Sequence, residues 1–258
     1  MTSVSIIGCG HMGSALARGL ARTGTHTVTA SDPDTDALAA VEQYCAETTT
    51  GLEGTAEADV VFLAVKPEVV GTVLAELDLP ADRTLVTVAA GVPRAFVQAR
   101  TDATVVRIMP NLAAETGNMA AAVTWDEPDE DVAAILDDLG TFVVIDEDLM
   151  DVATALNGSG PAFVTYFLQC MKQAAVAEGL DPAAAETLVA QTVKGAGETV
   201  LQSEESPDEL VEAVCSEGGT TIEGMEVLWD SDVSSVVDDT LGAAAERSRE
   251  LATEVDDE

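Results

Sequence analysis

Three glycines near the start of the chain have the spacing of a dinucleotide-binding turn. Gly8, Gly10 and Gly13 lie in "IIGCGHMG", directly after an apolar run and at the start of a helical pattern. In this arrangement the first glycine makes a tight turn, the second lets the backbone approach a pyrophosphate, and the third permits close helix–strand packing. The N–H groups at the helix start, including those of His11 and Met12, would hold the phosphates. A glycine turn that binds nothing is the alternative, and the strand–turn–helix context disfavours it.

Two residues at the end of the next predicted strand bear on which dinucleotide would bind. Asp32 follows Gly8 by 24 residues (32 − 8), close to the place of the acid that binds a cofactor ribose. It would favour NADH by repelling the 2′-phosphate of NADPH, whereas Ser31 could donate a hydrogen bond to that phosphate. No Arg or Lys lies between Arg22 and Lys66. Because Asp32 could equally serve as a helix cap or turn residue, the choice between NADH and NADPH stays open.

Further candidate contacts fall at the ends of other predicted strands, on the sheet edge where α/β proteins bind ligands. The segment "FLAVKP" provides Ala64, Val65, Lys66 and Pro67. The segments "AAGV" (89–92) and "RIMPNL" (107–112) are expected to line the nicotinamide side, through residues that include Ala90 and Gly91. The chain has three lysines, so a lysine at this edge suggests a contact, although a solvated strand end explains it equally well.

A polar, glycine-rich loop in the second half has the composition of an anion site. In "VCSEGGTTIEGM" (214–225), Gly218 and Gly219 follow an acid, and two threonines open an apolar helical pattern. One interpretation is a turn in which Thr220 or Thr221 caps the next helix. The other is a loop that presents backbone N–H groups to an anion at a helix start. The two are compatible, because Thr220 could cap the helix and also donate its N–H.

The first half of the chain must supply the scaffold for the glycine turn. Residues 1–148 alternate short apolar runs with helical patterns. Strands are predicted at 3–8, 26–31, 58–65, 84–90, 103–109, 118–125 and 141–146, and helices at 13–24, 34–44, 71–77 and 129–140. Such alternation predicts an α/β domain with a mostly parallel, doubly wound sheet.

Long helical periods replace the strand pattern in the second half, so we expect a helical domain over 149–258 after a dinucleotide-binding domain over 1–148. The helices are predicted at 148–156, 161–179, 182–203, 207–215 and 220–252. A helical half that leaves an apolar face exposed should self-associate. A homo-oligomer is therefore expected.

The chain is strongly acidic, with a formal net charge of −36 from 47 acidic and 11 basic residues. This charge excludes a nucleic-acid binder that works through phosphate contacts and opposes docking on anionic membranes. The acids are spread along the whole chain, which suggests a solvated coat suited to high salt. At about 1 M salt the Debye length falls to ~3 Å, so this self-repulsion would be screened. A melting temperature that did not depend on salt would contradict the hypothesis.

Cysteine usage and the first residues favour a cytoplasmic protein. The four cysteines show no CxxC spacing and no pairing with the two histidines, so no metal site is predicted and a reduced compartment is expected. The start "MTSVSIIGCG" lacks the basic region of a secretory signal. No apolar run reaches the length of a membrane span.

Several of these motifs together resemble the pyrroline-5-carboxylate reductase family, which makes proline by reducing a cyclic imine. They are "GCGHMG", "AVKP", "AAGV", "MPN", "GSGPAF", "SEGGTTIEG" and the closing "ERSREL". The resemblance covers essentially the full length, and the late loop is its most specific part. It implies a Rossmann-like domain followed by an all-α dimerisation domain, with NADPH or NADH as cofactor. It also implies an intertwined homodimer or higher assembly with active sites shared between subunits.

The resemblance further implies roles for residues of the second half. Thr221 would hydrogen-bond the ring nitrogen of the imine, and Ser216 would bind the substrate carboxylate. Besides Ser216, the carboxylate would be bound, largely through backbone N–H groups, by Gly218, Gly219 and Thr220. Pro161 would pack on the nicotinamide or the substrate ring. Glu204 would orient the amine, unless it is an exposed acid of the acidic coat.

Two residues depart from the family's pattern. Glu217 stands where the family usually has proline, and Asn157 where it usually has serine. A carboxylate at position 217 would weaken affinity for a substrate carboxylate unless it points outward or is screened by salt. Both departures bear on substrate affinity more than on the type of reaction.

Two other functions stay open. A β-hydroxyacid dehydrogenase also combines a Rossmann half with a helical half, but those enzymes resemble one another in a catalytic Lys with an Asn four residues later. The corresponding pairs here are Lys172 with Val176 and Lys194 with Glu198. A nucleotide-sensing protein without turnover is disfavoured by the polar, glycine-broken loops 157–161 and 216–221, which a scaffold would fill with helix formers.

Overall fold

The computed structural model describes residues 2–256, which form two compact units. One unit ends at Ser159 and takes up the chain again from Leu241, and the other is Gly160–Thr240. These units divide later in the chain than the domain boundary predicted near Asp148, because Met150 and Ala155 are buried in the first unit.

The first unit is built on one eight-stranded sheet with the order β3-β2-β1-β4-β5-β6-β7-β8. Its strands are β1 Ser3–Ile7, β2 Thr27–Ser31, β3 Glu47–Thr49, β4 Val60–Leu63, β5 Thr84–Thr87, β6 Thr104–Met109, β7 Met119–Thr124 and β8 Gly140–Val144. Every neighbouring pair is parallel except β6 and β7, which are antiparallel. The predicted mostly parallel, doubly wound sheet is confirmed.

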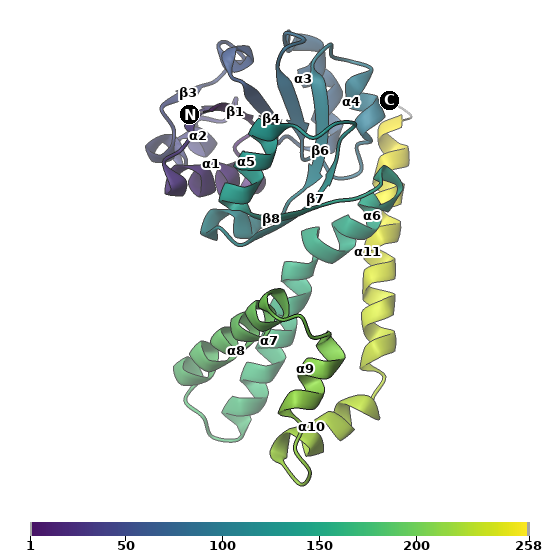
Figure 1. The fold of residues 1–258 in the computed structure, drawn as a ribbon. Helices are drawn as coiled ribbons and strands as arrows, with labels where there is room; N and C mark the ends of the chain where they lie inside the picture. The colour runs from purple at the N-terminus through teal and green to yellow at the C-terminus, as the bar shows by residue number, and fades with distance from the viewer. Residues whose placement is uncertain (1, 257–258) are drawn as a thin grey trace. The chain divides into compact units, whose positions relative to one another are not determined.

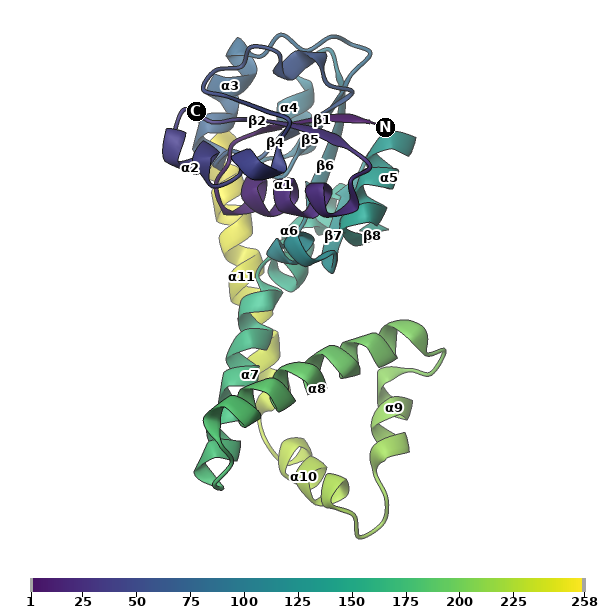
Figure 2. The same ribbon diagram turned by 90° about the vertical axis from the view of Figure 1, so that its left-hand side faces the viewer.

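Helices cover both faces of this sheet and create two apolar cores. The helices are α1 His11–Thr23, α2 Thr35–Ala39, α3 Val70–Glu76, α4 Arg94–Gln98, α5 Glu130–Leu139 and α6 Met150–Ala153. Side chains of α1, α2 and α5 enter one core, and side chains of α3 and α4 enter the other. Figure 2 shows α1 and α2 on the face opposite α3. The strands between the two cores are buried on both sides, which explains their near-continuous apolar runs.

The first unit also contains elements that the sequence pattern did not reveal. Strand β3 at the sheet edge and helix α4 were not predicted, and the helix expected over 34–44 is the short α2 followed by a 3-10 turn at Glu42–Tyr44. Three- to five-residue elements carry too few side chains to show a period. The predicted helix over 148–156 is α6 followed by a π-helical turn at Thr154–Gly158.

The second unit is helical, as predicted, and consists of α7 Gly160–Ala177, α8 Pro182–Gln202, α9 Pro207–Val214, α10 Thr220–Trp229 and the first residues of α11 Val233–Asp256 (Figure 1). The prediction of a single helix over 220–252 is wrong, because the helix is interrupted between Trp229, the last residue of α10, and Val233, the first residue of α11. Ser231 lies at the break: its hydroxyl donates to the carbonyl of Leu228 at 2.7 Å and accepts the N–H of Val233 at 3.2 Å. A short polar side chain of this kind competes with helical backbone bonds.

The second unit has almost no core of its own. All its residues are described, and Ala185 and Val189 are its two buried apolar side chains. Larger side chains stand exposed on several helices, including Tyr166 at 69%, Leu201 at 74% and Val227 at 71%. Within residues 2–256, none of the helices combines the length and apolar character that a membrane span requires.

Candidate functional site

The glycine turn after β1 has the geometry that its spacing predicts. Gly8 has φ +97°, and a Cβ on it would lie 2.7 Å from the carbonyl oxygen of Ala64. A Cβ on Gly13 would lie 1.8 Å from the carbonyl oxygen of Gly8. Only glycine fits at either position, because the backbone is left-handed at the first and another backbone segment lies too close at both.

The N-terminus of α1 is open at the place where a pyrophosphate would bind. Gly10 is the N-cap of α1, with no side-chain cap bond in the described structure, and nothing lies within 4 Å of a Cβ built on it. His11 is exposed, whereas Met12 is half-buried against the core. Free N–H groups at a helix start favour an anion. The residues therefore fit the pyrophosphate of a dinucleotide.

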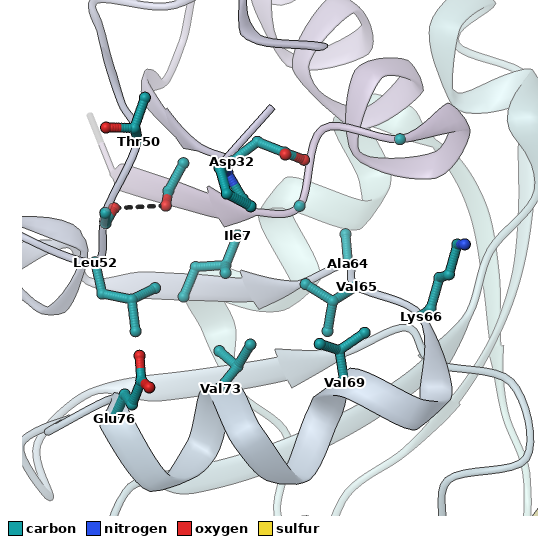
Figure 3. A pocket seen from close by; sticks show the side chains of 15 residues that line it. Ile7, Asp32, Thr50, Leu52, Ala64, Val65, Lys66, Val69, Val73 and Glu76 are labelled. Atoms are coloured by element: carbon teal, nitrogen blue, oxygen red, sulfur yellow. Dashed lines mark hydrogen bonds between the residues drawn. The ribbon is translucent and has the colours of Figure 1, made fainter. Parts of the chain in front are cut away.

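A pocket of about 420 Å³ extends from this turn along the carboxyl ends of β1, β2 and β4 (Figure 3). Its apolar wall comes from Ile7, Leu52, Val65, Val69 and Val73, with Ala64 beside them. Its polar and glycine positions are Gly8, Gly10, Ser31, Asp32, Thr50, Gly51, Lys66 and Glu76. This size and lining suit part of a nucleotide, which is an apolar ring joined to a sugar and phosphates.

Backbone hydrogen bonds hold Asp32 and Ser31 in place in this pocket. The Asp32 carboxylate accepts the N–H of Cys9 at 2.6 Å through one oxygen and the N–H of Asp34 at 2.8 Å through the other. It is thus a turn residue, and the cap of α2 is Asp34 instead. The hydroxyl of Ser31, which is buried, donates to the carbonyl of Gly51 at 2.7 Å.

Cys9, which lies inside the glycine turn, has a thiol that is hard to ionise. Burial raises the pKa of the Cys9 thiol to about 12, and the nearby Asp32 carboxylate adds to that shift. The thiol stays protonated at neutral pH, so it adds no negative charge beside the phosphate position.

The remaining predicted cofactor contacts lie at the ends of β4 and β5. Lys66 is exposed and lines the pocket, and Pro67 begins the 3-10 turn that follows it. Ala90 packs with the small core around Met109. Gly91 has φ +73°, and a Cβ on it would lie 2.8 Å from the Cβ of Leu251 in α11. Close packing against α11 therefore explains this glycine.

An ion pair that the sequence analysis missed joins half-buried Glu147, in the 3-10 turn after β8, to buried Arg107 in β6. Glu147 accepts a hydrogen bond from Arg107 at 2.5 Å, from Thr124 at 2.5 Å and from the N–H of Arg94 at 3.0 Å. Burial alone would raise the pKa of Glu147, but these hydrogen bonds and the Arg107 charge bring it below its usual range. The sequence did contain a signal of this ion pair, an arginine inside the apolar strand "VVRIM", because a buried charge needs a partner.

Asn157, one of the two departures from the family pattern, bridges two strand ends. Its amide donates to the carbonyls of Met109 at 2.6 Å and Ala120 at 3.1 Å. In return, the side chain of Asn111 donates to the carbonyl of Asn157 at 3.1 Å. These bonds hold the "MPN" segment against the π-helical turn, so Asn157 has a structural role within the first unit.

In the second unit, the loop before α10 is a tight turn. The N–H of Gly219 donates to the carbonyl of Ser216 at 2.9 Å, and Gly218 between them has φ +69°. A Cβ on Gly219 would lie 2.4 Å from the Ser216 hydroxyl oxygen. Glu217 in this turn is exposed. The turn therefore requires glycine at position 218 and leaves little room for a side chain at position 219.

The predicted cap of α10 by Thr220 or Thr221 is wrong. Gly219 is the N-cap, without a side-chain cap bond among the described residues, and Thr220 and Thr221 are the first two residues of the helix. The cap position falls on Gly219 because its backbone is still extended, whereas Thr220 already belongs to the helix. The N–H groups of the first helical turn remain for an anion.

The last two candidates of the second unit lie elsewhere on its helices. Pro161 is exposed in the first turn of α7, and its carbonyl accepts the hydroxyl of Thr165 at 2.7 Å. Glu204 is exposed between α8 and α9, in a loop ordered by Ser203 and by the capping box of Ser206 and Glu209.

Comparison with known proteins assigns the chain to a family. A pyrroline-5-carboxylate reductase of Methanosarcina acetivorans is 36% identical over 96% of this chain and 97% of its own length. The chain belongs to the pyrroline-5-carboxylate reductase family. Another member, from Escherichia coli K12, is 33% identical over 96% of this chain and 98% of its own length. The resemblance read from the motifs is confirmed.

Matches to family profiles and solved structures agree with this assignment. Residues 147–251 match the family described as pyrroline-5-carboxylate reductase dimerisation, and residues 3–91 match that described as NADP oxidoreductase, coenzyme F420-dependent. The pyrroline-5-carboxylate reductase of Coxiella burnetii has a TM-score of 0.86 at 29% identity, covering 97% of this chain and 98% of that one. That of Plasmodium falciparum, solved with NADP bound, has a TM-score of 0.85 at 26% identity, covering 97% and 98%.

These comparisons confirm the predicted fold, a Rossmann-like domain followed by a helical region. They also support homo-oligomerisation of this pyrroline-5-carboxylate reductase family member, because its helical half matches a dimerisation family.

Proposed function

We propose that the protein reduces 1-pyrroline-5-carboxylate to L-proline, as the last step of proline biosynthesis. The observation that carries the proposal is near full-length similarity to reductases of this name, at 36% and 33% identity. A β-hydroxyacid dehydrogenase and a nucleotide sensor are not favoured by these relatives.

In the proposed reaction, a bound NADH or NADPH supplies the hydride to the imine carbon. The pocket of the first unit would hold the cofactor, with the pyrophosphate on the N–H groups at the start of α1. The protein thus contributes position and charge, since Gly8, Gly10 and Gly13 leave room for the phosphates.

The loop before α10 would bind the substrate. We propose that the Ser216 hydroxyl and the N–H groups at the start of α10 bind the carboxylate, and that the Thr221 hydroxyl meets the ring nitrogen. Because the N–H of Gly219 is used in the turn, the donors proposed for the carboxylate are those of Thr220 and Thr221. Glu217 would interfere little in high salt, since its charge is exposed and therefore screened.

Pro161 and Glu204 complete the proposed site. Pro161 would pack on the nicotinamide or the substrate ring. Glu204 would orient the amine, but its exposed position favours a solvated acid. An iminium substrate needs no strong general acid, which suits a site whose proton relays are threonine and water.

We further propose a cytoplasmic homodimer, or a larger assembly built from it. The exposed apolar side chains of the second unit need a cover, and a second copy of this chain provides one.

The test is the loss of reduced-nicotinamide absorbance on adding pyrroline-5-carboxylate, in high potassium chloride, with NADH and NADPH used separately. Formation of proline with either cofactor would support the proposal. No turnover with either cofactor, in a protein shown to be folded, would refute it.

A further inference from the structure

The pocket of the first unit carries information on which reduced nicotinamide it accepts. NADH and NADPH differ only at the 2′-oxygen of the adenosine ribose, which is a hydroxyl in NADH and a phosphate in NADPH. In a Rossmann-like site this oxygen lies beside the carboxyl end of the second strand. Ser31 ends β2, and Asp32 follows it in the pocket wall.

Asp32 is a fixed negative charge at that position. Two backbone N–H groups, from Cys9 at 2.6 Å and Asp34 at 2.8 Å, hold its two carboxylate oxygens. Each carboxylate oxygen can accept a second hydrogen bond, so the group can still receive a ribose hydroxyl. It cannot swing away from a phosphate without losing both backbone bonds.

The pocket offers a 2′-phosphate little that would compensate for this charge, with the Thr50 hydroxyl as its one other neutral side-chain donor besides Ser31. The Ser31 hydroxyl donates to the carbonyl of Gly51 at 2.7 Å, so it could donate to a phosphate only by giving up this bond. The lining residues are all described, and Lys66 is the one base among them, while Glu76 adds a second acid. In Figure 3 the Lys66 ammonium points away from the end formed by Thr50, Leu52 and Glu76.

We propose that this pocket selects NADH over NADPH, with Asp32 as the residue that discriminates. The selection differs from the cofactor in the names of the matching family and of the Plasmodium structure, both of which mention NADP. A carboxylate close to a phosphate in a partly enclosed pocket is screened less by salt than two surface charges are. The preference should therefore persist in high potassium chloride.

The test is isothermal titration of the full-length protein with NADH and with NADPH, in potassium chloride that keeps it folded. We expect the Kd for NADPH to exceed that for NADH by at least about tenfold. Asp32→Asn keeps the shape of the side chain and removes its charge, so it should shrink this ratio at least about threefold, mainly by improving NADPH binding. Asp32→Ser tests the same charge if the Asn variant does not fold.

Asp82→Asn is the matched control, because it removes one exposed charge from the same unit at a residue that does not line the pocket. Its ratio should change by less than about twofold. Equal or tighter binding of NADPH by the wild type, no binding of either cofactor, or an unchanged ratio in both Asp32 variants would overturn the proposal. The titration contains no pyrroline-5-carboxylate, so a protein that prefers NADH but does not reduce the imine would refute the proposed function and leave this inference standing.

Discussion

The two units differ in what stabilises them. In the first unit, two apolar cores enclose the sheet, and side chains such as Phe62, Leu16 and Leu85 are fully buried. In the second unit, which is described completely, only Ala185 and Val189 among the apolar side chains are buried. A domain needs a core to offset the conformational entropy of its ordered residues. The first unit has its own core, whereas the second must obtain one by association.

The same contrast applies to the two candidate binding regions. The cofactor pocket is fixed by contacts among β1, β2 and β4 inside one unit. The loop before α10 is shaped by local turn geometry, but the helix that follows it has no buried residue. We therefore expect cofactor binding to depend on the chain alone and substrate binding to depend on assembly as well.

The largest expected effect comes from charging the apolar surface of the second unit. Leu188 in α8 is 58% exposed, and Leu188→Asp would place a charge in the proposed interface. We expect light scattering to show loss of the oligomer, with activity lower by more than about 100-fold, a change of over 2.7 kcal/mol. Val143→Asp in β8, where the side chain is 61% exposed, is the matched control. It should leave the oligomeric state and the activity unchanged. An intact oligomer in Leu188→Asp would contradict the assignment of this surface.

Two substitutions in the glycine turn should separate stability from cofactor binding. Gly13→Ala puts a methyl group 1.8 Å from the carbonyl oxygen of Gly8, so we expect the free energy of unfolding to fall by about 3 kcal/mol. Gly10→Ala meets nothing within 4 Å and should retain stability while it weakens dinucleotide binding by occupying the phosphate space. Denaturant titration and calorimetry measure the two quantities. A stable Gly13→Ala variant would count against the packing seen here.

Thr221→Ala should reduce turnover without affecting the first unit. Loss of one preorganised donor at a reacting group lowers kcat by about 100-fold, and we expect this in steady-state assays with pyrroline-5-carboxylate. Cofactor affinity should not change, because the pocket lies in the other unit. Thr187→Ala is the control, since the Thr187 hydroxyl donates to a carbonyl of its own helix, that of Ala183, at 3.0 Å. Equal activity of both variants would remove Thr221 from the site.

Acid should destabilise the first unit through Glu147. Its pKa in the folded protein is depressed, so its contribution is fully present above the unfolded value of about 4.3 and is lost as the pH falls through the lower folded value. Glu147→Gln should cost about 2 kcal/mol at neutral pH, because the buried Arg107 loses its charged partner, and should flatten the acid limb of unfolding curves. In the second unit, Glu186 also has a lowered pKa, from Lys172, but that pair is exposed, so Glu186→Gln should leave the acid limb nearly unchanged. Identical acid limbs for the wild type and Glu147→Gln would contradict the role of this pair.

The smallest effect is expected from restoring the residue that the family usually has at position 157. A serine hydroxyl donates one hydrogen bond, whereas the Asn157 amide donates two, to Met109 and Ala120. Asn157→Ser should therefore lower the free energy of unfolding by about 1 kcal/mol and leave the KM for pyrroline-5-carboxylate unchanged. A changed KM with unchanged stability would move Asn157 from a structural role to the substrate site.

Much of the fold was predictable because its signals are local. Apolar segments of six to eight residues predicted the positions of seven strands, and β3 was missed because it is a three-residue edge strand. The break between α10 and α11 was missed because the helical period continues on both sides of it. Nothing in the period shows that Ser231 competes with backbone bonds there.

The sequence alone determined the glycine turn and the two glycines before α10, since only glycine tolerates the backbone of Gly8 and Gly218. Residue type and spacing carry that information directly. Tertiary structure decided which partners the polar side chains have. The Asp32 carboxylate accepts two backbone N–H groups, and the Ser31 hydroxyl donates to the carbonyl of Gly51. Glu147 pairs with Arg107. These partners lie 20 to 40 residues apart except for Asp34. Which donors and acceptors meet depends on how the strands are ordered in the sheet, and that order is set by packing of the whole unit.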